Sequence, residues 1–146
     1  MFNLIYRDGA PENAGHYEGF QKDAKATVMS VGELVSVKNG VASKYANGMP
    51  YGVVARASGK DEEDVAVLRI TDDMIFRTTG TASAAYAPDN LKGNFAELTH
   101  DGVEYNLMSV ETGYAFEITG VVSCETNDMG QAGGRAVLEG RFVNLG

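Results

Sequence analysis

Short apolar runs divided by turn residues constrain the fold of this chain more than any other feature. These runs recur at a spacing of roughly 8–12 residues, which is typical of β-sandwiches and β-barrels. No stretch keeps the period of an amphipathic helix for three turns. The pattern predicts an all-β, mainly antiparallel fold: a small β-barrel or β-sandwich-like domain.

Two turn signals and one alternating segment support this prediction. Asn39-Gly40 lies between two strand-like runs, and Asn-Gly favours a hairpin because both positions of a type I′ turn need positive φ. Asp101-Gly102 repeats the signal. Tyr114, Phe116 and Ile118 alternate with smaller or polar residues, which indicates a strand buried on one face.

The chain divides by pattern into two parts. Residues 1–25 are predicted to be an N-terminal arm or irregular segment, and residues 26–146 a single β-rich domain. Within the first part, residues 2–7 fit either a strand or an arm, and residues 7–25 show little periodicity, so we expect a loop or extended arm there. We see no second domain and no repeat of fixed period.

Composition excludes several classes of protein. The formal net charge is −8, and no cluster of Lys and Arg offers a phosphate-binding surface, so we expect no nucleic-acid partner. No apolar run approaches the roughly 18 residues of a membrane span, and the start of the chain has no secretory signal pattern, so we expect no membrane association and synthesis in a cytoplasm. An acidic surface suits solubility at high concentration.

No residue pattern predicts catalysis. Gly-x-Ser-x-Gly is absent, and the two histidines, His16 and His100, lie in the N-terminal segment and beside a predicted turn. The acidic runs 61–64 and 72–73 do not match a calcium-loop spacing, and the single Cys124 permits no intramolecular disulfide. We therefore predict a protein that is not an enzyme, with no catalytic residue, no cofactor and no metal.

Short glycine- and valine-containing segments follow one another along the chain: Val31-Gly32-Glu33-Leu34-Val35, Lys38-Asn39-Gly40-Val41-Ala42, residues 48–54 and Val65-Ala66-Val67-Leu68-Arg69-Ile70. This series resembles the head-decoration (capsid cement) proteins of tailed bacteriophages. The closing part of the chain also resembles the end of such proteins, so that the likeness covers roughly residues 26–143.

The resemblance implies a structural virion protein that binds the outer surface of a phage capsid and stabilises it. Its partner would be the major capsid protein, and the chain would form a homo-oligomer, with a trimer favoured, on the virion surface after synthesis in the host cytoplasm. In that family an N-terminal arm typically binds the capsid, and here it corresponds by position to residues 1–25. The candidate arm residues are Phe2, Leu4, Ile5, Tyr6 and Arg7.

Two alternatives remain open at the level of sequence. The same apolar residues fit an ordinary first strand of the sheet as well as they fit an arm. The whole chain fits a tail- or fibre-associated β-module, or a ligand-binding β-sandwich with a carbohydrate ligand, although the absence of Trp weakens the carbohydrate reading.

Overall fold

Strands and connecting loops make up the whole of the described chain, and no helix occurs in it. The computed structural model describes all residues except 8–16, 84–91, 101–104 and 125–133. The predicted all-β class is confirmed. Its sheets are mixed rather than purely antiparallel, because β2 runs parallel to β4, and β7 parallel to β9.

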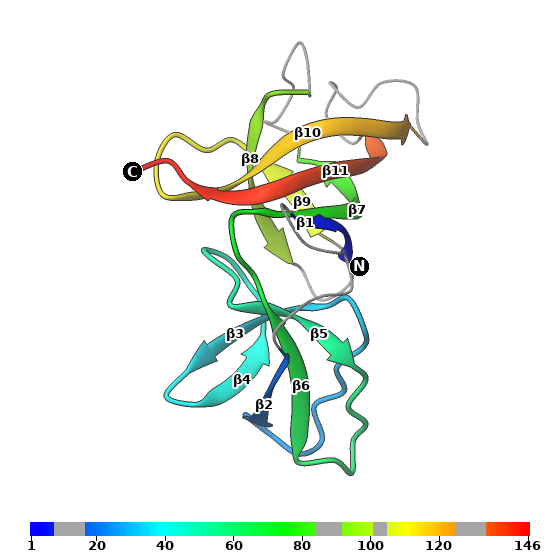
Figure 1. The fold of residues 1–146 in the computed structure, drawn as a ribbon, viewed down its shortest axis with the longest axis vertical. Coiled ribbons are helices and arrows are strands. Elements are labelled where there is room, and N and C mark those ends of the chain that lie inside the picture. Colours follow the sequence, from blue (N-terminus) through cyan, green and yellow to red (C-terminus); the bar gives the residue numbers. More distant parts are fainter. Residues whose placement is uncertain (8–16, 84–91, 101–104, 125–133) are drawn as a thin grey trace.

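The strands form two units that lie one above the other in Figure 1, and the first strand of the chain belongs to the second unit. The first barrel is a closed ring in the order β2-β4-β3-β5-β6. Its strands are β2 (Tyr17–Lys22), β3 (Leu34–Lys38), β4 (Val41–Lys44), β5 (Gly52–Arg56) and β6 (Asp64–Arg69).

The second sheet has the order β1-β7-β11-β10-β8-β9, and an additional β7–β9 pairing closes its last five strands into a ring. Strand β1 therefore pairs with β7 at the margin of that ring. The strands are β1 (Asn3–Arg7), β7 (Met74–Ala82), β8 (Phe95–His100), β9 (Tyr105–Met108), β10 (Tyr114–Cys124) and β11 (Arg135–Asn144).

The two rings have the same topology. In each ring the first strand in sequence is parallel to the third and antiparallel to the fifth; the fifth pairs with the fourth, the fourth with the second, and the second with the third. The residue pairing in the two parallel ladders is also equivalent: Lys22 opposes Ala42 in the first barrel, and Ala82 opposes Leu107 in the second sheet. The spacing between equivalent positions changes along the chain, which is why no fixed period is visible in the sequence.

Local backbone details repeat with the topology. Gly32 and Gly93 both have positive φ, +89° and +84°, and both lie two residues before the second strand of their ring. The Gly32 N–H donates to the Val54 carbonyl at 2.9 Å, and the Gly93 N–H donates to the Ile118 carbonyl at 2.7 Å. The ladder register then shifts directly after Val54 in β5 and directly after Ile118 in β10.

Neighbouring apolar residues on the first barrel face opposite ways and enter different cores. Val35, Val54 and Val67 pack inside the barrel with Met29, whereas Leu34, Val53 and Leu68, each adjacent in sequence, pack against the second sheet. A strand that is buried on both faces reads as a continuous apolar run rather than an alternating one. The runs in β3, β5 and β6 therefore encode both the barrel interior and its junction with the second sheet.

The domain boundary predicted after residue 25 does not coincide with a boundary in the structure. The segment predicted as a loop or arm over residues 7–25 contains β2, which forms five pairs with β6 in the first barrel. The prediction missed β2 because its inward positions include the charged residues Glu18 and Lys22, so the strand shows little apolar alternation.

Candidate interaction surface

Of the five predicted arm residues, Phe2 directly precedes β1 and the other four lie in it. Phe2 is 1% exposed and lies in the larger core, with its ring edge-on to Phe76, Tyr105 and Phe116. Leu4 packs against that core from a half-buried position.

The remaining three residues complete the strand. Ile5 lies where the β1–β7 register shifts, and Tyr6 and Arg7 oppose Ile75 and Met74. Of the two sequence alternatives, the structure has the first strand of a sheet. Phe2 is a core residue.

A groove of about 180 Å³ runs along β1, between it and the first barrel. Its lining is mostly apolar and comes from both units. The lining residues are Phe2, Asn3, Leu4, Tyr17, Val31, Gly32, Val53, Val54, Ala55, Leu68 and Phe76.

Exposed apolar side chains lie at this groove. Tyr17 is 56% exposed and Val31 54%, and both belong to the lining. Met1 is half exposed and lies against Gly32, where its Cβ would approach a Cβ on that glycine to 2.9 Å. Large apolar side chains gathered at one groove mark a surface that contacts another molecule more often than isolated ones do.

The backbone at Gly32 fixes one end of the groove. The Phe2 N–H donates to the Gly32 carbonyl at 2.7 Å. A side chain at Gly32 would also meet the Phe2 backbone oxygen and nitrogen at 3.1 and 3.2 Å, and φ there is +89°. Glycine is required at this position for both reasons, conformation and close approach.

Charges lie near the end of the groove rather than inside it. Burial lowers the pKa of the Met1 α-amino group, and the nearby Glu33 carboxylate opposes that effect. The Glu33 Oε1 also lies 3.8 Å from the Lys44 Nζ. The groove lining itself contains no charged residue.

A junction of buried hydrogen bonds holds the two units together beside this groove. The Leu34 N–H donates to the Tyr105 Oη at 2.8 Å, and the Tyr45 Oη donates to the Leu98 carbonyl at 2.7 Å. Burial raises the pKa of Tyr105 to about 12 and that of Tyr45 also well above its usual value. Tyr105 of the second sheet thus bonds to a backbone N–H of the first barrel, and Tyr45 of the first barrel bonds to a backbone carbonyl of the second sheet.

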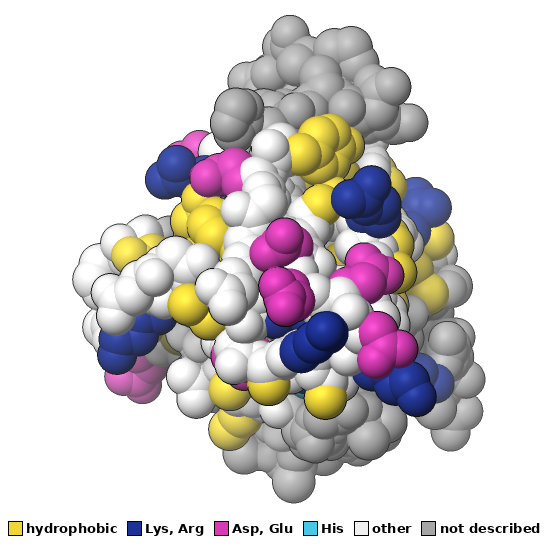
Figure 2. All heavy atoms as spheres, turned by 90° about the horizontal axis from the view of Figure 1, so that it is seen from below, with side chains coloured by type: hydrophobic (Ala, Val, Ile, Leu, Met, Phe, Trp, Pro, Cys, Tyr) yellow, Lys and Arg dark blue, Asp and Glu magenta, His cyan; other side chains and the backbone are white. Residues whose placement is uncertain are grey.

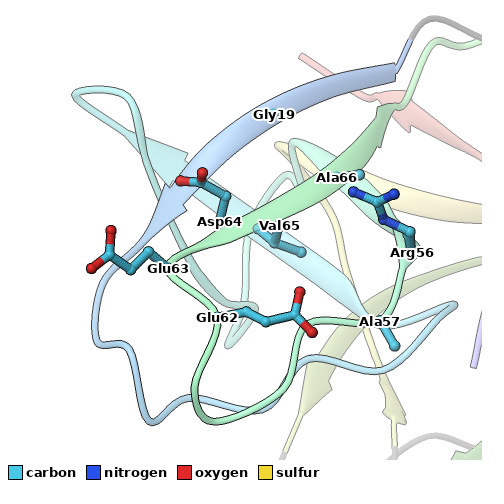
Figure 3. A pocket seen from close by; sticks show the side chains of 8 residues that line it. All are labelled: Gly19, Arg56, Ala57, Glu62, Glu63, Asp64, Val65 and Ala66. Carbon is cyan, nitrogen blue, oxygen red and sulfur yellow. The ribbon is translucent and has the colours of Figure 1, made fainter.

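A second, more polar hollow of about 490 Å³ lies on the first barrel (Figure 3). Glu62, Glu63 and Asp64 line it at the start of β6, with Arg56 on the opposite side. Within the described residues no group of three or more His, Cys, Asp or Glu side chains is placed to hold a metal ion. This hollow presents a mixed-charge surface, in keeping with the alternating acidic and basic side chains seen over this end of the molecule in Figure 2.

A third hollow, of about 280 Å³, has Tyr51 as the aromatic residue in its lining. The Tyr51 ring already contacts the Arg69 guanidinium at 5.5 Å and lies edge-on to Phe20, and its Oη donates to Glu18 at 2.6 Å. Sugar binding needs an aromatic face free for stacking, and these contacts use much of this ring. The hollow therefore does not favour the carbohydrate-binding alternative.

Comparison with known protein families matched no family model, and comparison with curated proteins found no match in sequence. In the part of the chain that the structure describes, no helix is long and apolar enough to cross a membrane.

Proposed function

We propose that this chain is a structural virion protein that binds the outer surface of a phage capsid and stabilises the shell. The observation that carries the proposal is the exposed apolar groove along β1, with Tyr17 and Val31 in its lining. A protein that acts by covering another surface needs an apolar contact area on a body that holds its shape. The buried tyrosine hydrogen bonds between the two units supply that rigidity.

The sequence resemblance to head-decoration proteins supports the same proposal independently of the groove. It includes Val31-Gly32-Glu33-Leu34-Val35, whose first two residues line the groove and whose last two begin β3. The partner is the major capsid protein, and the copies on the shell associate with one another, with a trimer as the expected state. Light scattering on the purified chain measures that state; a monomer both free and on the shell contradicts it.

Binding to the shell is tested by cosedimentation. Expanded, undecorated heads of the phage that encodes the chain are mixed with increasing amounts of the full-length protein. We expect saturable binding and heads that withstand a higher temperature before releasing DNA. Failure to bind expanded heads at micromolar protein would contradict the proposed function.

A further inference from the structure

We propose that three backbone carbonyls at one end of the first barrel form a binding site for a primary ammonium group, which the native chain fills with its own lysine, Lys22. We call the carbonyls of Lys25, Thr27 and Gly59 the ammonium cage. The site is independent of the proposed function. Two sets of observations support it: the hydrogen bonds of the Lys22 ammonium, and the contacts that hold the cage in place.

The Lys22 ammonium is buried, and backbone carbonyls accept its hydrogen bonds. Lys22 ends β2 and is 3% exposed. Its Nζ donates to the carbonyl oxygens of Lys25, Thr27 and Gly59 at 3.0, 2.6 and 2.8 Å. A lysine ammonium has three N–H donors and no acceptor, so the cage offers one acceptor for each donor. The match in number indicates a site for a group with three donors on one nitrogen.

The first side of the cage is a turn that directly follows β2. The Asp23 Oδ1 accepts hydrogen bonds from the Ala24 N–H at 2.8 Å and from the Thr27 hydroxyl at 3.2 Å. The Thr27 N–H donates to the Ala24 carbonyl at 3.0 Å. These bonds fix the turn that carries the Lys25 and Thr27 carbonyls, and none of them involves the Lys22 side chain.

The other side of the cage is the loop between β5 and β6, which carries Gly59. The Gly59 carbonyl also accepts from the Glu62 N–H at 3.1 Å. Two backbone hydrogen bonds between Met29 and Ser58, at 2.9 and 2.8 Å, join this loop to the segment after β2, and the two lie side by side at the lower end of the molecule in Figure 1. The cage is therefore held from both sides without the lysine side chain, which lowers the cost of binding a free ligand there.

The geometry of the cage favours a primary ammonium over a divalent metal ion. Ca²⁺ binds oxygen at about 2.3–2.6 Å and Mg²⁺ at about 2.0–2.1 Å, and both take six or more oxygen ligands, carboxylates among them. The cage has three neutral acceptors at 2.6, 2.8 and 3.0 Å from the nitrogen. A fully methylated ammonium carries the same charge but has no N–H to donate. The ligand class is therefore a primary alkylammonium ion.

The second sheet shows which side chain the ladder accepts at this position. Ala82 is the equivalent of Lys22 in the parallel ladder and is 2% exposed. Lys22→Ala thus keeps a backbone and Cβ that the topology accepts. It removes three methylene carbons and the amino nitrogen, which are the heavy atoms of n-propylamine. The n-propylammonium ion is therefore the probe that refills the space.

Urea unfolding of Lys22→Ala tests the site. In about 0.1 M n-propylammonium chloride we expect its folding equilibrium constant to be at least about tenfold higher than in the same concentration of tetramethylammonium chloride. The matched control is Lys25→Ala, which removes the same atoms at an exposed position and keeps the Lys25 carbonyl. We expect this control and the wild type to differ by less than about twofold between the two salts. The same response of Lys22→Ala to both salts would overturn the proposal.

Circular dichroism covers the case in which Lys22→Ala is unfolded in tetramethylammonium chloride. Recovery of the β-sheet spectrum on addition of n-propylammonium would support the site. A chain that stays unfolded in both salts would contradict a cage that holds its shape without the lysine side chain.

Amine acetylation tests the native occupant of the cage without any substitution. On the folded wild type we expect Lys22 to react with limiting acetic anhydride at least about tenfold more slowly than Lys25, because the buried ammonium reacts only after local opening. Mass spectrometry of peptides gives the two rates. Equal rates would show that the Lys22 ammonium does not occupy the cage.

Discussion

The first barrel and the second sheet share one strand topology but fill equivalent positions with different chemistry. Lys22 lies in the ladder where the second sheet has Ala82, and both residues are almost fully buried. The Lys22 Nζ donates to the backbone carbonyls of Lys25, Thr27 and Gly59 at 3.0, 2.6 and 2.8 Å. This position in the ring of strands therefore accepts either the methyl group of alanine or a lysine ammonium whose hydrogen bonds are all satisfied.

The units also differ in what lies beside them. The second sheet carries β1 on β7, and the larger core lies mostly within this sheet and the junction, with Phe2 at its centre. The first barrel has its own smaller core of Met29 and valines. The order in which the strands pair is therefore set by the backbone. The junction between the two units depends instead on a few large side chains from outside each ring.

The largest expected effect comes from removing the Phe2 side chain from the larger core. We expect Phe2→Ala to lower the free energy of unfolding by about 3–5 kcal/mol, because the site is fully buried and contacts four aromatic rings. Urea unfolding measures it, with Tyr17→Ala, an exposed aromatic, as the control. A loss below about 1 kcal/mol would mean that β1 is not part of the core.

The next effect concerns the position at which the two rings differ most. We expect Lys22→Met to cost about 3 kcal/mol of stability, because three carbonyls lose their donor while the hydrophobic volume is kept. Lys25→Met, at an exposed position, is the matched control. If both substitutions left the denaturation midpoint unchanged, the ammonium cage would have no role in stability.

A smaller effect is expected at the junction. Tyr45→Phe removes the hydrogen bond to the Leu98 carbonyl without removing the ring, so we expect a loss of about 1 kcal/mol. Thermal unfolding of this variant and of Tyr114→Phe, whose ring is exposed, gives the comparison. Separation into two transitions would show that the hydrogen bond couples the units, and a single lowered transition would show that packing suffices.

The smallest effect is a pH dependence. Burial raises the pKa of Tyr105 to about 12, above the ordinary value of 10, so the unfolded chain loses this proton first. The stability linked to the protonated phenol is present below pH 10 and is lost as the pH rises towards 12. Tyr105→Phe should flatten that part of the pH–stability curve. A curve with the same slope in both proteins would contradict the assignment.

The local elements of the fold were predictable from the sequence, and the long-range closure was not. Asn39 and Gly40 have φ of 53° and 78°, which confirms the predicted tight turn between β3 and β4. Phe116 and Ile118 are buried as their alternation predicted, whereas Tyr114 is exposed near the start of β10. The predicted Asp101-Gly102 turn lies outside the described residues.

Ring closure depends on the short parallel pairings β2–β4 and β7–β9, each of two residue pairs. Such pairings bring together strands far apart in sequence and leave no local turn signal. The groove could not be predicted for the same reason, since Leu4, Val31 and Ala55 meet only after both rings close. The one signal in the sequence was the apolar start of the chain, which fitted an interacting arm and the first strand of a sheet equally well.

The most direct test of the account is a cryo-electron microscopy map of expanded heads decorated with the full-length chain. The account predicts density for two stacked β-units on the outer surface, with the groove between β1 and Val31 turned to the shell. Density in which this groove faces solvent would contradict the docking mode, and heads without added density would contradict the proposed function.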